Sequence, residues 1–491
     1  MNKNRVKKLI WIHLDIIITT IKDFIMLSPE QEVAYNKFCR GESMLISGPG
    51  GTGKSFLIKI LVERMRLTNK KSFQVTSTTG CSSVLLSNSI KVDGKNLAVR
   101  TINSWSGIKL CKGNNESIVN SIISNPYLLK SWRKIRTLII DEVSMMSCKM
   151  FDVLVSIARS SRGNNNSFGG IQLILLGDYL QLPPIPDVLD IETSKFAFES
   201  KEWYNVISIE NHIELKTIYR QKDEILKNIL NEVRVGELSE SNKIILQSYV
   251  GRKYCPEEHN GIISIQILPT RKGVIHVNTT EYNKVSGVEF TYKHSIDKEY
   301  MTYIDSGDKI EHMVINEYRK LTKQSVDYHI NDLKTNIPVD EKISLKVGVP
   351  VMILVNLDLE NGISNGSQGI VTSIDTYPTV SFSNGIRRMI MPYMWQSPDY
   401  PCITISQLPL TLSYASSIHK QQGTTIDIAR MSLGFNIFED SQIYVALSRI
   451  TSLDGLYLDS FHAQKITVNK KAKEFYEKFT QSKSLCINDQ V

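Results

Sequence analysis

The sequence has 491 residues, of which 42% are hydrophobic and 22% charged, a globular composition with room for about three or four domains. The formal net charge of +8 is compatible with a polyanionic partner such as nucleic acid, and equally with an ordinary solvated surface. The seven cysteines are scattered, so neither a disulfide framework nor a zinc site is expected and a reducing compartment fits best.

The first 26 residues are interpreted as an N-terminal extension. MNKNRVKK followed by LIWIHLDIIITTI is basic and then apolar, but His13 and Asp15 interrupt the run and no small-residue cleavage site follows. The run is also too short to span a bilayer. We favour an accessory helix or upstream extension, with Met26 as an alternative start, over a mitochondrial presequence. No stable membrane association is expected.

Apolar runs alternate with helical patterns through the first half of the chain. Strands are predicted at residues 43–47, 72–77, 137–141 and 171–178. Apolar residues return every three or four positions at 55–67, 149–161 and 223–236, which predicts helices. Residues 160–170 read as a polar loop. Continuous apolar strands separated by helices are typical of a buried parallel sheet in an α/β protein.

The pattern changes between residues 342 and 406. Short β-type runs there are broken by Asn-Gly and proline, and SNG at 383–385 predicts a hairpin turn. The chain then returns to a helical pattern and to SQIYVALS, residues 441–448, which reads as another strand. The coarse layout is two α/β lobes with a small all-β insert in the second.

GPGGTGKS, residues 48–55, follows a predicted strand and opens a predicted helix. Its glycines allow a tight turn whose successive N–H groups point at one anion, and the helix N-terminus adds partial positive charge. Lys54 can neutralise the β- and γ-phosphates, and the Ser55 hydroxyl can bind Mg²⁺. The stretch predicts a phosphate-binding loop.

Asp141 ends the apolar run TLIID, and Glu142 follows it directly. Because adjacent strand residues point in opposite directions, one carboxylate can address a metal while the other reaches a water molecule. We assign Asp141 to Mg²⁺ and Glu142 as the base that activates water, so hydrolysis is expected. Charge on the transferred phosphoryl group also calls for guanidinium groups. Arg220 and Arg449 are candidates, although either alone would more often be a surface residue.

Read in order, the segments GPGGTGKS, TSTTG, TINSWSGI, IIDEVSMM, GDYLQLPP, YRQKD, SIHKQQGTT and YVALSR resemble the motif series of superfamily 1B DNA helicases. They are most similar to the petite-integration-frequency (PIF) family, related to RecD and Dda. The resemblance runs from about residue 27 to about residue 460. Its most specific part is EVSMMSCKMFDVLVSIARSSRG...FGGIQLILLGDYLQLPPI.

The resemblance implies two RecA-like P-loop NTPase lobes with parallel sheets and a small SH3-like β insert. The domains implied are 27–210 for lobe 1A with a wedge insertion near 88–130, 211–341 for the first part of lobe 2A, 342–406 for the insert, and 407–491 for the rest of lobe 2A with a C-terminal helix.

It also implies roles at the nucleotide. Gln31 would recognise adenine, Gln181 would sense the γ-phosphate with support from Asp178, and Gly423 would bring second-lobe backbone close. Arg220 and Arg449 would be arginine fingers that reach the γ-phosphate when the lobes close. The remaining ATP-binding residues implied are those of the phosphate loop: Gly48, Gly50, Gly51, Thr52, Gly53, Lys54 and Ser55.

For DNA, hydroxyls and amides suit phosphates, and an aromatic ring can stack on a base. The resemblance implies a track lined by Thr76, Thr78, Thr79, Thr101, Asn103, Trp105, Asn365, Ser367, His419 and Lys420. Three positions depart from the family pattern: Asn103 where histidine is expected, Trp105 where phenylalanine is usual, and Gln421 where serine is usual.

The activity implied is an ATP-dependent, Mg²⁺-dependent helicase that moves 5′ to 3′ on single-stranded DNA, with roles in DNA replication, repair and recombination. Its expected partners are single-stranded DNA and single-strand/duplex junctions, with RNA–DNA hybrids and G-quadruplexes left open. The alternatives are a translocase that acts on RNA–DNA or displaces proteins, and a scaffold that binds nucleotide without hydrolysis. The expected compartment is nucleus or cytoplasm, with the mitochondrion as an alternative.

Overall fold

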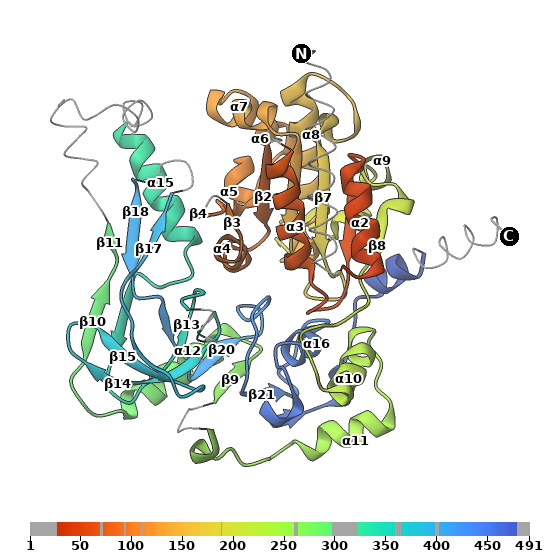
Figure 1. Cartoon of the computed structure of the whole chain (residues 1–491). Helices are drawn as coiled ribbons and strands as arrows, with labels where there is room; N and C mark the ends of the chain where they lie inside the picture. The colour runs from red at the N-terminus through yellow and green to blue at the C-terminus, as the bar shows by residue number, and fades with distance from the viewer. Residues whose placement is uncertain are drawn as a thin grey trace, which may run out of the picture.

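The structure is a computed structural model that describes residues 27–68, 72–92, 95–109, 111–187, 189–259, 264–296, 322–358, 361, 363, 365–397 and 402–478. The expectations for residues 1–26 lie outside the described residues. Two α/β lobes lie one above the other with a β-rich module beside them (Figure 1). Within these ranges, no helix is long and apolar enough to cross a membrane.

The first lobe is built on a six-stranded sheet, all parallel, in the order β5-β2-β6-β7-β1-β8. Its strands are β1 (Met44–Ser47), β2 (Phe73–Ser77), β5 (Arg100–Thr101), β6 (Thr137–Asp141), β7 (Gln172–Gly177) and β8 (His212–Glu214). The four strands predicted from the apolar runs are all present.

Helices cover both faces of this sheet. They are α2 (Pro29–Cys39), α3 (Lys54–Leu67), α4 (Gly80–Ser89), α5 (Ile102–Ser106), α6 (Asn115–Ile123), α7 (Pro126–Lys134), α8 (Cys148–Arg162) and α9 (Trp203–Val206). Strand residues alternate between the two cores: Ile139 packs with α2 and α3, whereas its neighbours Leu138 and Ile140 pack with α8. Burial on both faces explains why the strands read as continuous apolar runs.

The first lobe is larger than the predicted range 27–210. Strand β8 pairs with β1 beyond residue 210. Residues 470–478 are helical, and Ala472, Phe475 and Tyr476 are buried in the first-lobe core, whereas Lys473 Nζ donates to the Val235 carbonyl at the end of α10 at 3.3 Å. The chain's last described segment, expected with the second lobe, therefore contacts both lobes. Near 88–130, α5 to α7 contribute residues to the core around α8, and Val92 of the ribbon formed by β3 (Lys91–Val92) and β4 (Lys95–Asn96) packs against the core around α3. A wedge role for this region stays a prediction.

The second lobe holds a parallel sheet in the order β20-β9-β21-β22. Its strands are β9 (Ile265–Leu268), β20 (Ala415–Ser417), β21 (Ala429–Leu433) and β22 (Leu456–Phe461), and its helices are α10 (Glu224–Arg234), α11 (Glu240–Ser248), α12 (Arg271–Lys284) and α16 (Gln442–Leu447). The predicted α/β class, with parallel sheets in two lobes, is confirmed.

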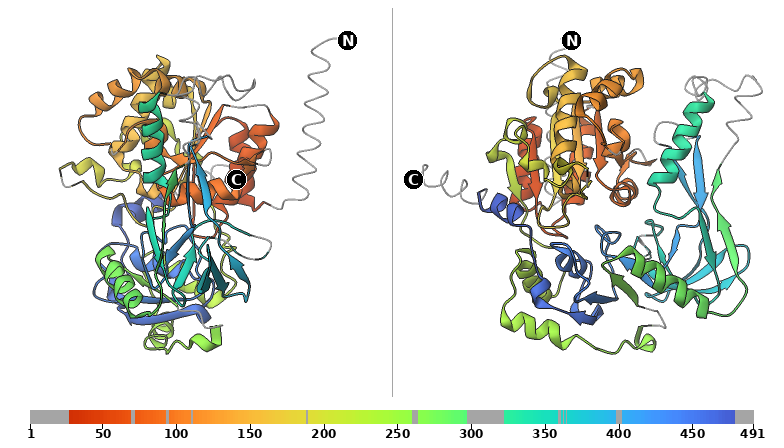
Figure 2. Two further views of the ribbon diagram at one scale, coloured as in Figure 1. Left: turned by 90° about the vertical axis from the view of Figure 1, so that its left-hand side faces the viewer. Right: turned by 180° about the vertical axis from the view of Figure 1, so that it is seen from behind.

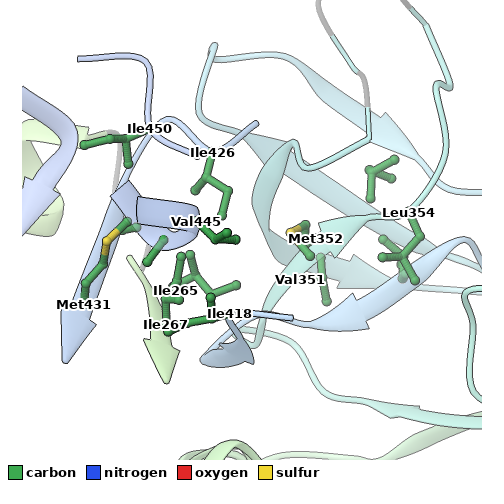
Figure 3. Close-up of a cluster of buried hydrophobic side chains, with 14 of the residues drawn as sticks. Ile265, Ile267, Val351, Met352, Leu354, Ile418, Ile426, Met431, Val445 and Ile450 are labelled. Carbon is green, nitrogen blue, oxygen red and sulfur yellow. The ribbon is translucent and has the colours of Figure 1, made fainter. Parts of the chain in front are cut away.

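The strand predicted at 441–448 is wrong, because these residues form α16. All six helical residues are buried. A helix that is enclosed on every side shows no polar face, so its short apolar run cannot be distinguished from a buried strand by periodicity. Val445 of this helix packs among the isoleucines of the second-lobe sheet (Figure 3).

The β module is wider than the predicted range 342–406. Its main antiparallel sheet has the order β16-β15-β14-β13-β19, and smaller sheets pair β10 with β12 and β11 with β18 and β17. The strands are β10 (Phe290–Lys293), β11 (Ser295–Ile296), β12 (Lys342–Leu345), β13 (Pro350–Ile353), β14 (Gln368–Ile374), β15 (Pro378–Phe382), β16 (Arg387–Met389), β17 (Tyr393–Gln396), β18 (Thr404–Gln407) and β19 (Leu410–Leu412), with helix α15 (Lys323–Asn336).

The predicted turn at 383–385 connects β15 and β16, where Gly385 adopts φ +82°. The SH3-like character of the module stays a prediction. Its hydrophobic core is continuous with that of the second-lobe sheet, as Val351 and Met352 lie beside Ile418 (Figure 3). Seen from behind, the module stands beside both lobes (Figure 2). It reaches the first lobe through Tyr393, whose hydroxyl donates to Asn88 Oδ1 at 2.9 Å.

Candidate active site

The phosphate loop connects β1 to α3. Gly51 and Gly53 adopt φ of +85° and +82°, a conformation that glycine enters without steric cost. The Thr52 hydroxyl donates to the Pro49 carbonyl at 2.9 Å, and Lys54 Nζ donates to the Gly48 carbonyl at 2.7 Å. These contacts hold the loop in a compact turn at the helix N-terminus, the geometry that suits an anion.

A cavity of about 550 Å³ opens above this loop. It is lined by Gln31, Gly50, Gly51, Gly53, Lys54, Ser55, Phe56, Asp141, Glu142, Gln181, Tyr219, Arg220, Gly423 and Arg449. All the residues predicted for catalysis and metal binding are in this set. Of those predicted for ATP, Gly48 and Thr52 are absent from the lining and act instead as hydrogen-bond partners within the loop.

Gln31 is fixed by the start of α2. It accepts from the backbone N–H of Ser28 at 3.1 Å in a capping box, and its Nε2 donates to the Thr52 carbonyl at 3.3 Å. The side chain is therefore anchored to both the helix end and the phosphate loop. Adenine recognition by Gln31 stays a prediction.

The two acidic residues face the same cavity, contrary to the alternation expected of neighbours on a strand. Asp141 ends β6, but Glu142 leaves the strand in a left-handed conformation with φ +55°. Burial, together with the charge of Glu142, raises the pKa of Asp141 to about 7. Glu142 Oε2 accepts from Gln422 Nε2 of the second lobe at 3.2 Å.

The donor set fits Mg²⁺. Ser55 and Asp141 offer hydroxyl and carboxylate oxygens, the ligands that this ion prefers. Across the described ranges no group of three or more His, Cys, Asp or Glu side chains could hold a metal by itself.

Arg220 and Arg449 meet at the phosphate loop. A β-carbon built on Gly50 would lie 3.4 Å from Arg449 Nη2 and 3.5 Å from Arg220 Nη1. Arg449 is 1% exposed, and burial together with the charge of Arg220 lowers its pKa to about 9. Arg449 is therefore not a surface residue, and Arg220 is half-buried.

Arg220 was expected in the second lobe, in the range that begins at residue 211. It belongs to the connector between β8 and α10, which runs against the phosphate loop: Tyr219 N–H donates to the Gly51 carbonyl at 2.8 Å. Arg220 Nη1 donates to the Ser448 carbonyl at 3.1 Å. Its side chain therefore contacts the second lobe, while the backbone beside it is bonded to the phosphate loop of the first lobe.

Asp178 is the centre of a buried hydrogen-bond network, and its partners could not be predicted from the sequence. Asp178 is fully buried and pairs with Arg234 through two hydrogen bonds of 3.0 and 3.1 Å. The hydroxyls of Tyr444 and Tyr476 also donate to its carboxylate, at 3.3 and 3.2 Å. Its carbonyl accepts from the Gln181 N–H at 2.9 Å. Arginine in an amphipathic helix and tyrosine in an apolar run carry no local signal of such a role.

Two of the residues predicted to contact DNA lie in the first-lobe core. Thr76 is fully buried and its hydroxyl donates to the Ile139 carbonyl at 2.9 Å. Trp105 is 6% exposed, and its ring centroid lies 4.8 Å from that of Trp132. Both side chains therefore serve the core in this structure, and direct DNA contact by them stays a prediction that their burial does not support.

Other predicted DNA contacts in the first lobe have structural partners. The hydroxyls of Thr79 and Thr101 cap the N-termini of α4 and α5. The Thr78 hydroxyl donates to the Glu142 carbonyl at 2.7 Å, and Asn103 Nδ2 donates to the Lys109 carbonyl at 2.6 Å. A DNA role for these four residues stays a prediction.

A second cavity, of about 350 Å³, brings Asn365 and the exposed Lys420 together with Gly80 and Cys81 of the first lobe. It joins both lobes and the β module. His419 lies outside its lining and pairs with Glu439 at 3.0 Å, and Ser367 is half-buried outside it. The structure thus brings together part of the predicted track.

Two family models match the chain. PIF1-like helicase matches residues 26–252, and the 2B domain of the DNA helicase Pif1 matches residues 329–374. The second match covers the second half of α15 and strands β12 to β14 of the β module.

The relatives cover nearly all of the chain. The ATP-dependent DNA helicase PIF1 of Danio rerio is 31% identical over 94% of this chain and 65% of its own length. The chain thus spans just under two thirds of that relative. The crystal structure of Pif1 helicase from Candida albicans is 30% identical, with a TM-score of 0.68 over 92% of this chain and 99% of that one. A structure concerning unwinding at forked duplex DNA by two coordinating Pif1 helicases is 25% identical, with a TM-score of 0.58 over 94% and 98% of the two chains.

Proposed function

This chain belongs to the PIF1-like helicase family, and on that premise we propose that it is an ATP-dependent DNA helicase. It moves 5′ to 3′ on single-stranded DNA and separates the duplex ahead of it. The observation that carries the proposal is the meeting of Arg220 and Arg449 beside Gly50, in one cavity with the two carboxylates.

In this proposal, the first lobe binds the triphosphate and activates water. Lys54 turns from the loop carbonyls to the phosphates, while the loop N–H groups orient them. Glu142 accepts the proton of the attacking water. Mg²⁺, held by Ser55 and Asp141, would neutralise charge on the phosphate oxygens.

The arginines make closure of the lobes depend on the terminal phosphate. Two guanidinium groups that converge on one point repel each other, and the anion offsets this repulsion. A γ-phosphate therefore binds the closed arrangement more tightly than the open one, which is the differential affinity that a ligand-driven switch requires. Hydrolysis removes this difference, and alternating closure moves the protein along the strand.

The cavity around Asn365 and Lys420 supports a strand track, because it is bounded by both lobes and the β module. The contacts to a DNA strand bound there would change whenever the distance between the lobes changes. Single-stranded DNA and forked junctions are the proposed partners, in line with the forked DNA of the similar Pif1 helicases. Cys39, Cys81, Cys111 and Cys148 form no disulfide, which suits a reducing compartment.

The first test uses Lys54→Ala, with Lys59→Ala, an exposed lysine on the same helix, as the matched control. ATP hydrolysis stimulated by single-stranded DNA is expected to be lost in K54A and kept in K59A. Parental turnover in K54A would refute the role of the phosphate loop.

The second test is strand displacement on duplexes with one 5′ or one 3′ tail, together with RNA–DNA and G-quadruplex substrates. Unwinding from the 5′ tail alone is expected. Unwinding from the 3′ tail alone would overturn the proposed direction, and displacement confined to RNA–DNA would favour the hybrid translocase.

A further inference from the structure

Tyr444 is the residue of the second lobe that bonds the backbone of the phosphate loop directly. Its hydroxyl accepts from the Gly50 N–H at 3.2 Å and donates to Asp178 Oδ2 at 3.3 Å. The side chain is 2% exposed, so water does not compete for either bond. One hydroxyl therefore connects a loop amide to a buried carboxylate through a helix of the opposite lobe.

The hydrogen bond from Gly50 to Tyr444 bears on ATP hydrolysis because of what surrounds Gly50. It lies beside the guanidinium groups of Arg220 and Arg449, as the built β-carbon shows. Its position therefore determines how far the loop stands from the arginines. Arg449 follows Tyr444 by five residues, across the C-terminus of α16, and its Nε donates to the Val445 carbonyl at 2.9 Å. Tyr444 and Arg449 thus move together with this helix.

Asp178, which accepts the hydrogen bond of the Tyr444 hydroxyl, is itself held in place. Its carboxylate is held by Arg234 and by the Leu180 N–H, and it is fully buried. Its neighbour in the same loop, Leu182, is buried in the core of the second lobe. A hydroxyl that donates to this carboxylate has a fixed direction, so its lone pairs are directed at Gly50.

We propose that Tyr444 is a positioning residue for ATP hydrolysis: its hydroxyl, oriented by Asp178, sets the distance between Gly50 of the phosphate loop and Arg449. The inference rests on the proposed ATPase function. The residue acts through the placement of Arg449 at the terminal phosphate. Its hydroxyl therefore matters more for turnover than for binding of nucleotide.

Tyr444→Phe keeps the buried ring and removes both hydrogen bonds. Tyr476→Phe is the matched control, because its hydroxyl donates to the other oxygen of the same carboxylate at 3.2 Å from the C-terminal helix, whereas the Gly50 N–H donates to the hydroxyl of Tyr444. We expect kcat of Y444F to fall about tenfold with KM for ATP within about twofold of the parent, and both constants of Y476F to stay within about twofold.

Binding of nucleotide analogues gives a readout that loss of stability alone would not produce. Y444F is expected to bind ADP like the parent and to bind ADP with aluminium fluoride, a mimic of the transferring phosphoryl group, about tenfold more weakly. In an Arg449→Lys background, Y444F is expected to have little further effect on kcat, because both changes act on the same contact.

The inference is overturned if Y444F has parental kcat, or if Y476F loses as much activity as Y444F. It is also overturned if the fold-loss in kcat of the double variant Y444F/R449K equals the product of the two single losses. Absence of ATP hydrolysis in the parent chain would instead contradict the proposed function. The two failures are therefore distinguishable, since the parent is measured in every series.

Discussion

Removal of Arg234 should expose the cost of leaving a buried charge without its partner. Arg234 and Asp178 form a bidentate pair with 3.0 and 3.1 Å contacts, and Arg234 also reaches Glu214 at 3.2 Å. Arg234→Ala leaves Asp178 buried with only hydroxyl and amide partners. Breaking a buried pair costs about 3 to 5 kcal/mol. The remaining hydrogen bonds to Asp178 lead us to expect the lower end, about 3 kcal/mol.

The matched control is Arg430→Ala. Arg430 pairs with Asp459 at 2.7 Å, but the two side chains are 45% and 28% exposed. Because solvent screens such a pair, the loss expected is below about 1 kcal/mol. The free energy of unfolding is measured by urea titration of both variants, with tryptophan fluorescence as the signal, to which the buried Trp105, Trp132 and Trp203 of the first lobe contribute.

The pH dependence gives the sign of the effect. Burial alone would raise the pKa of Asp178, but the charge and hydrogen bonds of Arg234 hold it below its ordinary value. The paired carboxylate therefore stabilises the parent above the unfolded pKa of about 3.9, and this contribution is lost as pH falls through the folded pKa. In R234A burial is uncompensated, so Asp178 takes up a proton at higher pH. The difference in the free energy of unfolding between the parent and R234A should therefore become smaller from pH 7 to pH 5. A gap that widens, or a loss no greater than that of R430A, would refute this reasoning.

Four further predictions concern the cavity, the first-lobe core and the proposed strand track. Glu142→Gln should lower ATP turnover by about 100-fold or more while nucleotide binding persists, and parental turnover would remove it as the base. Gly51→Ala should abolish hydrolysis, because its β-carbon would lie 2.5 Å from that of the connector arginine, whereas Gly41→Ala, with the similar φ of +83° and open space, should keep it. Trp105→Phe should lower the melting temperature by a few degrees without weakening DNA binding, as expected of a core residue. Lys420→Ala should weaken DNA binding and reduce the salt slope by about one, and an unchanged slope would exclude a phosphate contact.

Local chemistry was sufficient for the phosphate loop, four strands of the first-lobe sheet and the two carboxylates. GPGGTGKS carries its conformation in its own glycines and its charge in Lys54, so Lys54, Ser55 and the loop glycines that line the cavity could be named from the sequence, whereas Gln31 and Gln181 came from the family resemblance. The conformation of Glu142 could not be named, because a left-handed residue just after a strand leaves no mark in the pattern. The helix at 442–447 was hidden for a related reason, since complete burial erases its period.

What the sequence by itself determined is the chemistry available to this protein: a phosphate cradle, an acid pair, and arginines in an order typical of one helicase family. Only the tertiary structure decided which side chains meet. Tyr444 and Asp178 are 266 positions apart, and whether such residues touch depends on how two lobes pack. The same packing buried Thr76 and Trp105, because residue type alone does not tell whether a hydroxyl or a ring faces a groove or a neighbouring strand or helix.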